Sequence, residues 1–119
     1  MATILLVDDD EDLNEALSIF LEMKGYRIKS ASSQDIVRQI LSLSFPDLIL
    51  LDVLIKDCDD RKLCKEIKDC SNNSIKVILM SASSELLENF ELWGADAALE
   101  KPFDFNIFCR KISGILNKH

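Results

Sequence analysis

Short apolar runs alternate with amphipathic segments along this chain, and this alternation constrains the fold more than any other feature of the sequence. A segment with apolar residues spaced like one side of a helix follows each run. Strands that alternate with helices form a mostly parallel sheet with helices on both faces. The sequence therefore predicts an α/β fold, a doubly wound five-stranded parallel sheet of order 2-1-3-4-5 with five helices. The predicted strands are residues 3–7, 27–30, 48–51, 76–80 and 97–99.

Most of the predicted helices have recognisable ends. The first ends at Gly25, which suits the left-handed residue that follows many helices. The third is predicted over about 60–69, and the fourth runs from an N-cap at Ser84 to Trp93. The last begins near Asp104. The apolar stripe of the first helix consists of Leu13, Ala16, Leu17, Phe20 and Leu21.

Length and charge narrow the class of protein. With 119 residues the chain has the size of one domain with a single core. Its formal net charge of -7 opposes binding to nucleic acid, which depends on basic contacts to phosphate. The longest apolar runs are far shorter than the roughly 18 residues that a membrane-spanning helix needs. We therefore expect a cytoplasmic domain that binds neither nucleic acid nor membranes.

The cysteines indicate free thiols rather than a metal site. Cys58, Cys64, Cys70 and Cys109 contain no C-x-x-C pair, and the only histidine is His119. Zinc sites usually combine such pairs with further cysteine or histidine ligands. The sequence therefore predicts reduced thiols and no zinc centre.

Polar residues capable of chemistry follow four of the predicted strands. Asp8 and Asp9 follow the first strand, Asp52 the third, Ser81 the fourth and Lys101 the fifth. In open doubly wound sheets, ligands bind outside the carboxyl ends of the strands. With the order 2-1-3-4-5 the first and third strands are neighbours. We therefore expect these side chains to meet in one crevice.

This combination of side chains favours phosphoryl chemistry. Clustered carboxylates repel one another unless a cation joins them, and Mg²⁺ suits carboxylate oxygens best. Asp52 lies between the other groups, and an aspartate can act as a nucleophile toward phosphorus. Lys101 and Ser81 would supply a positive charge and a hydrogen-bond donor. Single acids after strands are commonly turn or cap residues, so the joint placement carries the inference.

The same segments resemble the receiver domain of bacterial two-component response regulators, the CheY-like family. The resemblance covers essentially the whole chain and implies the family's flavodoxin-like fold. Each motif alone is weak, and together they are specific. They are ILLVDD at 4–9, DLILLD at 47–52, VILMSA at 77–82, GAD at 94–96 and KPF at 101–103.

The resemblance implies a role for each acid. Asp52 would accept a phosphoryl group from a sensor histidine kinase or a phosphotransfer protein. Asp8, Asp9, Asp52 and the backbone carbonyl of Leu54 would hold Mg²⁺. Such a domain promotes its own phosphorylation and dephosphorylation in a phosphorelay, and it is not a conventional enzyme.

The resemblance also implies roles for the residues that follow the fourth and fifth predicted strands. Lys101 would contact the phosphoryl group, and Ser81 would move to hydrogen-bond it. The Lys101–Pro102 bond looks like the cis peptide of the family. Residues 1–119 would form one receiver domain, either alone or as the amino-terminal part of a longer regulator.

Three positions depart from the family pattern. Lys56 and Asp60 stand where the family usually has proline and glycine, so we expect a looser and more charged loop after Asp52. Ala98 stands where the family usually has Tyr or Phe, a ring that reports activation. The switch in this chain is therefore expected to use something else.

An apolar docking surface is our hypothesis for that switch. Trp93, Ala97, Ala98 and Ile107 lie on the fourth helix, fifth strand and last helix, the face on which we expect phosphorylation-dependent homodimers or partner binding. The alternative is that Trp93 only fills the space left by the small side chain of Ala98.

Two other functions remain open at this point. Asp8-x-Asp10 imitates the nucleophile and acid/base pair of haloacid-dehalogenase-type phosphatases, but Glu11 and Asp12 follow it instead of the residues typical of that motif. A pseudo-receiver, which keeps the fold as a protein-interaction module without phosphorylation, is the second alternative. A flavodoxin-type flavin carrier is disfavoured because no Ser/Thr/Gly-rich phosphate loop follows the first strand.

Overall fold

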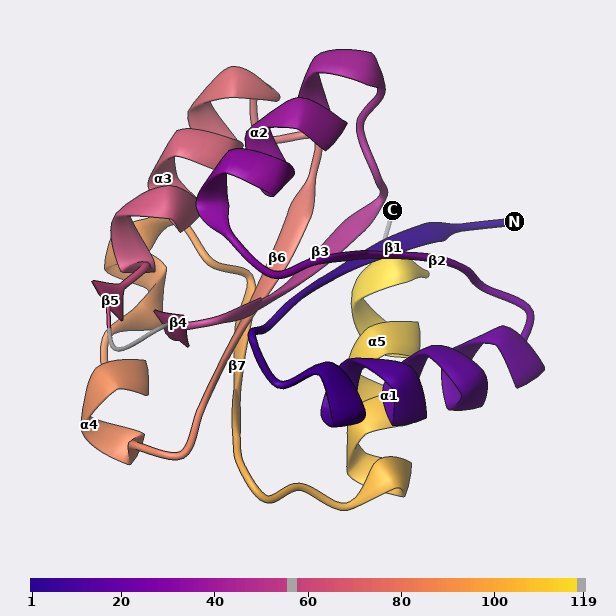
Figure 1. The fold of residues 1–119 in the computed structure, drawn as a ribbon. Helices are drawn as coiled ribbons and strands as arrows, with labels where there is room; N and C mark the ends of the chain where they lie inside the picture. The colour runs from indigo at the N-terminus through magenta and orange to yellow at the C-terminus, as the bar shows by residue number, and fades with distance from the viewer. Residues whose placement is uncertain (56–57, 118–119) are drawn as a thin grey trace.

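Five parallel strands form the centre of the computed structural model, which describes residues 1–55 and 58–117 (Figure 1). The expectations for Lys56 and His119 lie outside these residues. The strands lie in the order β2-β1-β3-β6-β7, which is the predicted order 2-1-3-4-5 of the five long strands. They are β1 (Thr3–Val7), β2 (Arg27–Ala31), β3 (Leu48–Asp52), β6 (Lys76–Ser81) and β7 (Ala97–Glu100).

A short antiparallel ladder that the sequence did not predict follows β3. It consists of β4 (Leu54–Ile55) and β5 (Cys58–Asp59). In the register of this ladder Leu54 lies opposite Asp59. The two described sides of the loop after Asp52 therefore pair with each other.

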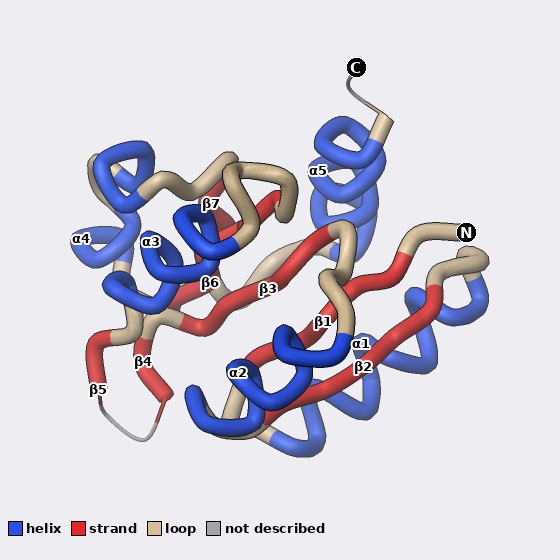
Figure 2. The backbone as a smooth tube through the Cα atoms, turned by 90° about the horizontal axis from the view of Figure 1, so that it is seen from above, coloured by secondary structure: helices blue, strands red, loops and turns tan. Residues whose placement is uncertain are grey.

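Helices cover both faces of the sheet, as predicted (Figures 1 and 2). On one face lie α1 (Glu11–Met23) and α5 (Phe105–Leu116). On the other lie α2 (Gln34–Leu43), α3 (Arg61–Cys70) and α4 (Ser84–Leu87). In the described part of the chain, no helix has the length and apolar character needed to cross a membrane.

The central strands are continuous apolar runs because helices bury both of their faces. Successive residues of a strand point to opposite faces. Leu5 and Val7 therefore pack in the cluster beneath α2 and α3, while Ile4 and Leu6 pack in the cluster beneath α1 and α5. All four side chains are fully buried. The two clusters hold the strands in place from either side.

The predicted helix over residues 84–93 is wrong because it is interrupted. Helix α4 ends at Leu87, Glu88 is extended, and Asn89 has a left-handed φ of 55°. A 3-10 helix, η1 (Phe90–Trp93), follows. Asparagine enters the left-handed region more readily than most residues. Both pieces still pack on the cluster beneath α2 and α3, so their apolar residues keep a spacing like that of one helix.

Two smaller expectations are also wrong. The N-cap of α4 is Ser83, whose hydroxyl accepts the N–H of Leu86, and not Ser84. Ala16 is exposed, although it was assigned to the apolar stripe of α1. Asn14 is buried on that helix instead.

The cysteine side chains that the structure describes are free thiols. They belong to Cys64, Cys70 and Cys109. Burial raises the pKa of the Cys64 thiol to about 12, so this thiol stays protonated and inert.

A partly buried ion pair joins α3 to the segment that precedes β7. The Lys68 Nζ donates to Asp96 Oδ2 at 2.9 Å and to the Ile75 carbonyl at 2.8 Å. Asp96 Oδ2 also accepts the N–H of Val77 at 2.9 Å. The Lys68 side chain is 7% exposed and that of Asp96 27%. Asp96 of the GAD segment therefore has a structural role.

We expect Asp96→Asn to lower the free energy of unfolding by about 2–3 kcal/mol, because it leaves the buried charge of Lys68 without a counterion. The amide can still accept the N–H of Val77. Urea denaturation followed by circular dichroism measures the change. Asp69→Asn, at an exposed site near the end of α3, is the control and should stay within about 0.5 kcal/mol of wild type. Equal losses in both variants would contradict this role.

Candidate functional site

The predicted site residues meet at the carboxyl edge of the sheet. Asp8 follows β1, Asp52 ends β3, Ser81 ends β6 and Lys101 follows β7. The parallel pairing of β1 with β3, β3 with β6 and β6 with β7 brings these ends together. A cavity of about 390 Å³ opens there. Its lining residues are Asp52, Leu54, Ser81, Ala82, Ser83 and Lys101.

Three carboxylates form a candidate cation site beside this cavity. Asp8 and Asp52 are buried and Asp9 is exposed, and each offers an oxygen within 4.8 Å of the other two. A backbone hydrogen bond helps to orient the Asp8 carboxylate, since its Oδ1 accepts the N–H of Asp10 at 3.0 Å. Carboxylate oxygens are the donors that Mg²⁺ prefers. The donor set therefore fits a hard divalent cation.

Lys101 brings a positive charge to the carboxylates. Its Nζ lies 2.6 Å from Asp8 Oδ2 and 3.8 Å from Asp52 Oδ2. The peptide bond between Lys101 and Pro102 is cis. One ammonium group thus lies within reach of two acids from neighbouring strands.

The environment of Asp52 disfavours its charge. Burial raises the pKa of Asp52 to about 6, and the negative charge of Asp8 acts in the same direction. Lys101 opposes this rise, as does the N–H of Leu54, which donates to Asp52 Oδ1 at 3.4 Å. A cation bound to both acids would offset their repulsion.

Ser81 presents a hydroxyl at the same edge. Its side chain is buried, and its Oγ accepts the N–H of Ser83 at 3.0 Å. The hydroxyl hydrogen can therefore be donated to an anion in the cavity. The backbone of Ser81 is held as well, because its carbonyl accepts the N–H of Lys101 at 2.8 Å.

Sequence reasoning missed Asn14, which supports the end of β1. Its Nδ2 donates to the carbonyl oxygen of Asp8 at 2.8 Å. Asn14 lies on the inward face of α1 with Leu17 and Leu21. A polar residue on the inward face of a helix needs a hydrogen-bond partner. Its inward position is therefore the feature of the sequence from which a role for Asn14 could have been predicted.

Asp60 has a larger structural role than its departure from the family pattern indicated. It is buried, and Gln34 Nε2 donates to its Oδ1, while Oδ2 has no hydrogen-bond partner among the described residues. Burial raises the pKa of Asp60. Its N–H donates to the Val53 carbonyl at 2.6 Å, which ties the end of the β4–β5 ladder to the end of β3.

The residues predicted for the output face have different environments. Trp93 and Ala98 are half-buried against the cluster beneath α2 and α3, whereas Ala97 packs against the opposite cluster. Ile107 is 48% exposed, and Leu92 of η1 is 77% exposed. On η1 and α5, solvent therefore reaches Leu92 and Ile107 more than Trp93.

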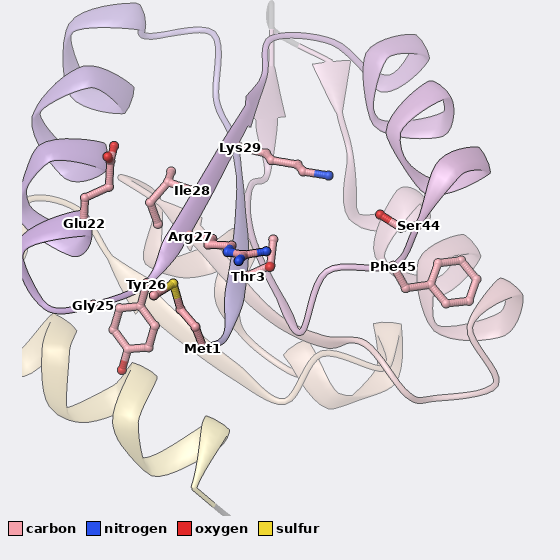
Figure 3. A pocket seen from close by; sticks show the side chains of 10 residues that line it. All are labelled: Met1, Thr3, Glu22, Gly25, Tyr26, Arg27, Ile28, Lys29, Ser44 and Phe45. Carbon is pink, nitrogen blue, oxygen red and sulfur yellow. The ribbon is translucent and has the colours of Figure 1, made fainter.

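A separate cavity of about 540 Å³ lies beside the starts of β1 and β2 (Figure 3). Its lining carries both signs of charge, from Glu22, Arg27 and Lys29, beside the rings of Tyr26 and Phe45. It contains none of the predicted site residues. The predicted site residues all lie at the other edge of the sheet.

Comparison with known proteins identifies close relatives of the chain. Residues 4–113 match the family described as "Response regulator receiver domain". Among curated proteins, the transcriptional regulatory protein CpxR homolog of Haemophilus influenzae is 36% identical over 99% of this chain and 52% of its own length. The chain spans about half the length of the curated relatives it matches.

Solved structures show the same fold. A two-component response regulator from Clostridium difficile has a TM-score of 0.90 and 28% identity, with 99% of this chain and 98% of that chain covered. TrrA from Thermotoga maritima, in complex with Mg(2+)-BeF, has a TM-score of 0.86 and 27% identity over 97% and 99% of the chains. The beryllofluoride-activated NtrC4 receiver domain dimer has a TM-score of 0.88 and 30% identity, with 98% of this chain and 97% of that chain covered.

We expect Asp52→Asn to stabilise the metal-free protein at pH 7.5 by on the order of 2 kcal/mol. The pKa of Asp52 is about 6 in the folded protein and about 3.9 in an unfolded chain, so the folded state holds its proton more tightly. The stability cost of the charge is therefore present above pH 6 and disappears as the pH falls toward 4. The gain from the substitution should shrink over the same range.

Urea denaturation in EDTA at several pH values tests this expectation. Asp12→Asn, in the exposed first turn of α1, provides the control and should show no comparable gain at pH 7.5. A gain from Asp52→Asn that does not change between pH 7.5 and pH 4 would refute it.

Proposed function

Because this chain belongs to the response regulator receiver domain family of two-component signalling, we propose that it is switched by phosphorylation of Asp52. The observation that carries the proposal is the convergence of Asp8, Asp9, Asp52, Ser81 and Lys101 at one edge of the sheet. This set combines a nucleophile, a cation site, a hydroxyl donor and a fixed positive charge.

In the proposed reaction an ionised oxygen of Asp52 attacks the phosphorus of a phosphohistidine in a sensor histidine kinase or a phosphotransfer protein. A bond forms between this oxygen and phosphorus as the bond to the histidine nitrogen breaks, and the nitrogen keeps the electron pair. With a pKa of about 6, most of Asp52 is ionised at neutral pH. The Lys101 ammonium neutralises charge on the phosphoryl oxygens.

The proposal includes Mg²⁺ held by Asp8, Asp9, Asp52 and the backbone carbonyl of Leu54. When bound, the ion supplies charge neutralisation for the phosphoryl group. The described carboxylates support this assignment because their oxygens lie within 4.8 Å of one another. The TrrA complex contains Mg²⁺, which is an observation on that relative only.

The switch follows from the added charge. A phosphoryl group adds nearly two negative charges to an acidic site, so a new acceptor appears in front of the Ser81 hydroxyl. Ser81 gains a hydrogen bond in this state, and such a differential contact shifts the population of conformers. We assign the response to the face formed by α4, β7 and α5, with Trp93, Ala97, Ala98 and Ile107.

The domain would act as a phosphoacceptor that promotes its own phosphorylation and dephosphorylation, and not as an enzyme that turns over a substrate. We assign residues 1–119 to one receiver domain working in the cytoplasm, where its thiols stay reduced. The curated relatives are transcriptional regulators about twice as long as the shared part. The charge of -7 disfavours direct binding of nucleic acid by this domain.

We expect acetyl phosphate with Mg²⁺ to add one phosphoryl mass to the wild-type protein, because Asp52 is the acceptor. Intact-mass spectrometry should find no addition in Asp52→Asn or in the presence of EDTA. Asp10→Asn is the matched control, since asparagine preserves the N-cap of α1 and the modification should remain.

Other outcomes identify the alternatives. An unchanged wild-type mass would favour the pseudo-receiver. A modification that survives in Asp52→Asn, or phosphomonoester turnover that depends on Asp10 and not on Asp52, would favour the phosphatase.

We also expect the phosphorylated domain to form homodimers through the α4-β7-α5 face. Ile107→Asp should weaken this self-association by about tenfold or more without changing the phosphorylation, because it places a charge in an apolar contact. Sedimentation velocity with acetyl phosphate measures the effect. Ile19→Asp, at a similarly exposed position on α1, is the control, and equal loss in both variants would count against this face.

A further inference from the structure

Arg61 connects the loop after Asp52 with η1. It is the first residue of α3, and its Nε lies 2.9 Å and 3.0 Å from the two carboxylate oxygens of Asp59. Its Nη2 donates to Asp59 Oδ2 at 2.5 Å. The guanidinium carbon of Arg61 lies 5.1 Å from the centre of the Trp93 ring. One side chain therefore contacts two elements that are distant in sequence.

Backbone contacts join Asp59 to the acceptor. Asp59 lies opposite Leu54 in the β4–β5 ladder, and the N–H of Leu54 donates to Asp52 Oδ1. The next residue, Asp60, donates its N–H to the Val53 carbonyl at 2.6 Å. The backbone of Asp59 thus pairs with the backbone directly after Asp52, while its carboxylate accepts the N–H of Arg61 at 3.0 Å.

At the other end of the path, Trp93 packs against the same core cluster as Ala98, the position where the family usually has an aromatic residue. The Trp93 ring is at the end of η1, between the left-handed residues Asn89 and Gly94. Main-chain hydrogen bonds hold the backbone of this segment, with the Leu92 N–H on the Asn89 carbonyl and the Gly94 N–H on the Glu91 carbonyl, both at 2.9 Å. The position of the half-buried ring itself depends on side-chain contacts such as that of Arg61.

We propose that Arg61 is a positioning residue that couples the state of Asp52 to the position of Trp93. This inference rests on the proposed function, because it needs phosphorylation of Asp52. Phosphorylation changes the carboxylate of Asp52 that accepts the Leu54 N–H, so Leu54 moves together with its ladder partner Asp59. Because Asp59 holds the guanidinium group of Arg61, this group then shifts over the Trp93 ring. The coupling takes the place of the missing ring at position 98.

Arginine suits this task for a chemical reason. Its planar guanidinium can hold a carboxylate with two donors and lie over an aromatic ring at the same time. Lysine carries a compact charge that does neither with the same geometry. Arg61→Lys therefore retains the charge and removes the coupling, which separates this role from simple charge balance.

Trp93 fluorescence tests the coupling directly, since Trp93 is the only tryptophan of the chain. Acetyl phosphate with Mg²⁺ is added to the full chain, and emission and intact mass are measured on the same samples. The wild-type emission should change as the phosphoryl mass appears. In Arg61→Gln and Arg61→Lys the amplitude should fall by about threefold at equal phosphorylation. Lys62→Gln, at the next and exposed position, should keep the wild-type amplitude.

Asp59→Asn supplies a second test of the same path. It should reduce the emission change as Arg61→Gln does, and the double variant should lose no more than either single one, because both remove one connection. Additive losses would show independent structural effects and overturn the proposal. A full emission change in Arg61→Gln, or no change in the phosphorylated wild type, would also overturn it. Absence of the phosphoryl mass in the wild type would overturn the proposed function itself, together with the coupling.

Discussion

The parallel ladder through β1, β3, β6 and β7 is the constraint on which the site depends. Val7 pairs with Leu51, so Asp8 and Asp52, which follow them, lie at the same height on the sheet edge. Asp52 pairs with Met80, which places Ser81 one residue further along the neighbouring strand. Chemistry-bearing side chains from distant parts of the sequence therefore meet without a long loop to position them. Fully buried aliphatic residues on both faces hold the ladder, which makes the edge a rigid support for mutually repelling charges.

Much of this arrangement could be predicted from the sequence, because strand positions depend on local apolar runs and the edge follows from topology. All five long strands were predicted to within one residue at their ends, and the convergence of Asp8, Asp9 and Asp52 followed from their order. The helix over 84–93 was wrong for a physical reason. The left-handed turn at Asn89 leaves the apolar side chains on the same side, so periodicity does not reveal the break.

The remaining features depend on contacts between residues far apart in the sequence. Asp60 meets Gln34, Lys68 meets Asp96, and Arg61 meets Trp93. Charged residues in helical segments usually face water, so composition alone gives no reason to pair them. Only the packing of α2, α3 and η1 against the same face of the sheet brings these partners together.

The break at Asn89 has a consequence for the route by which a modification at the site would reach the α4-β7-α5 face. A continuous helix moves as one rigid body, so a displacement at its first turn would appear at its last residue. Here Ser83, whose N–H contacts Ser81, caps a helix that ends at Leu87, and Trp93 belongs to a separate piece. In the proposed switch, a movement at Ser81 would enter the α4-β7-α5 face through α4, and a movement at Arg61 would enter it through η1. Substitutions in α4 and in η1 would then adjust the two routes separately, although both end at one face.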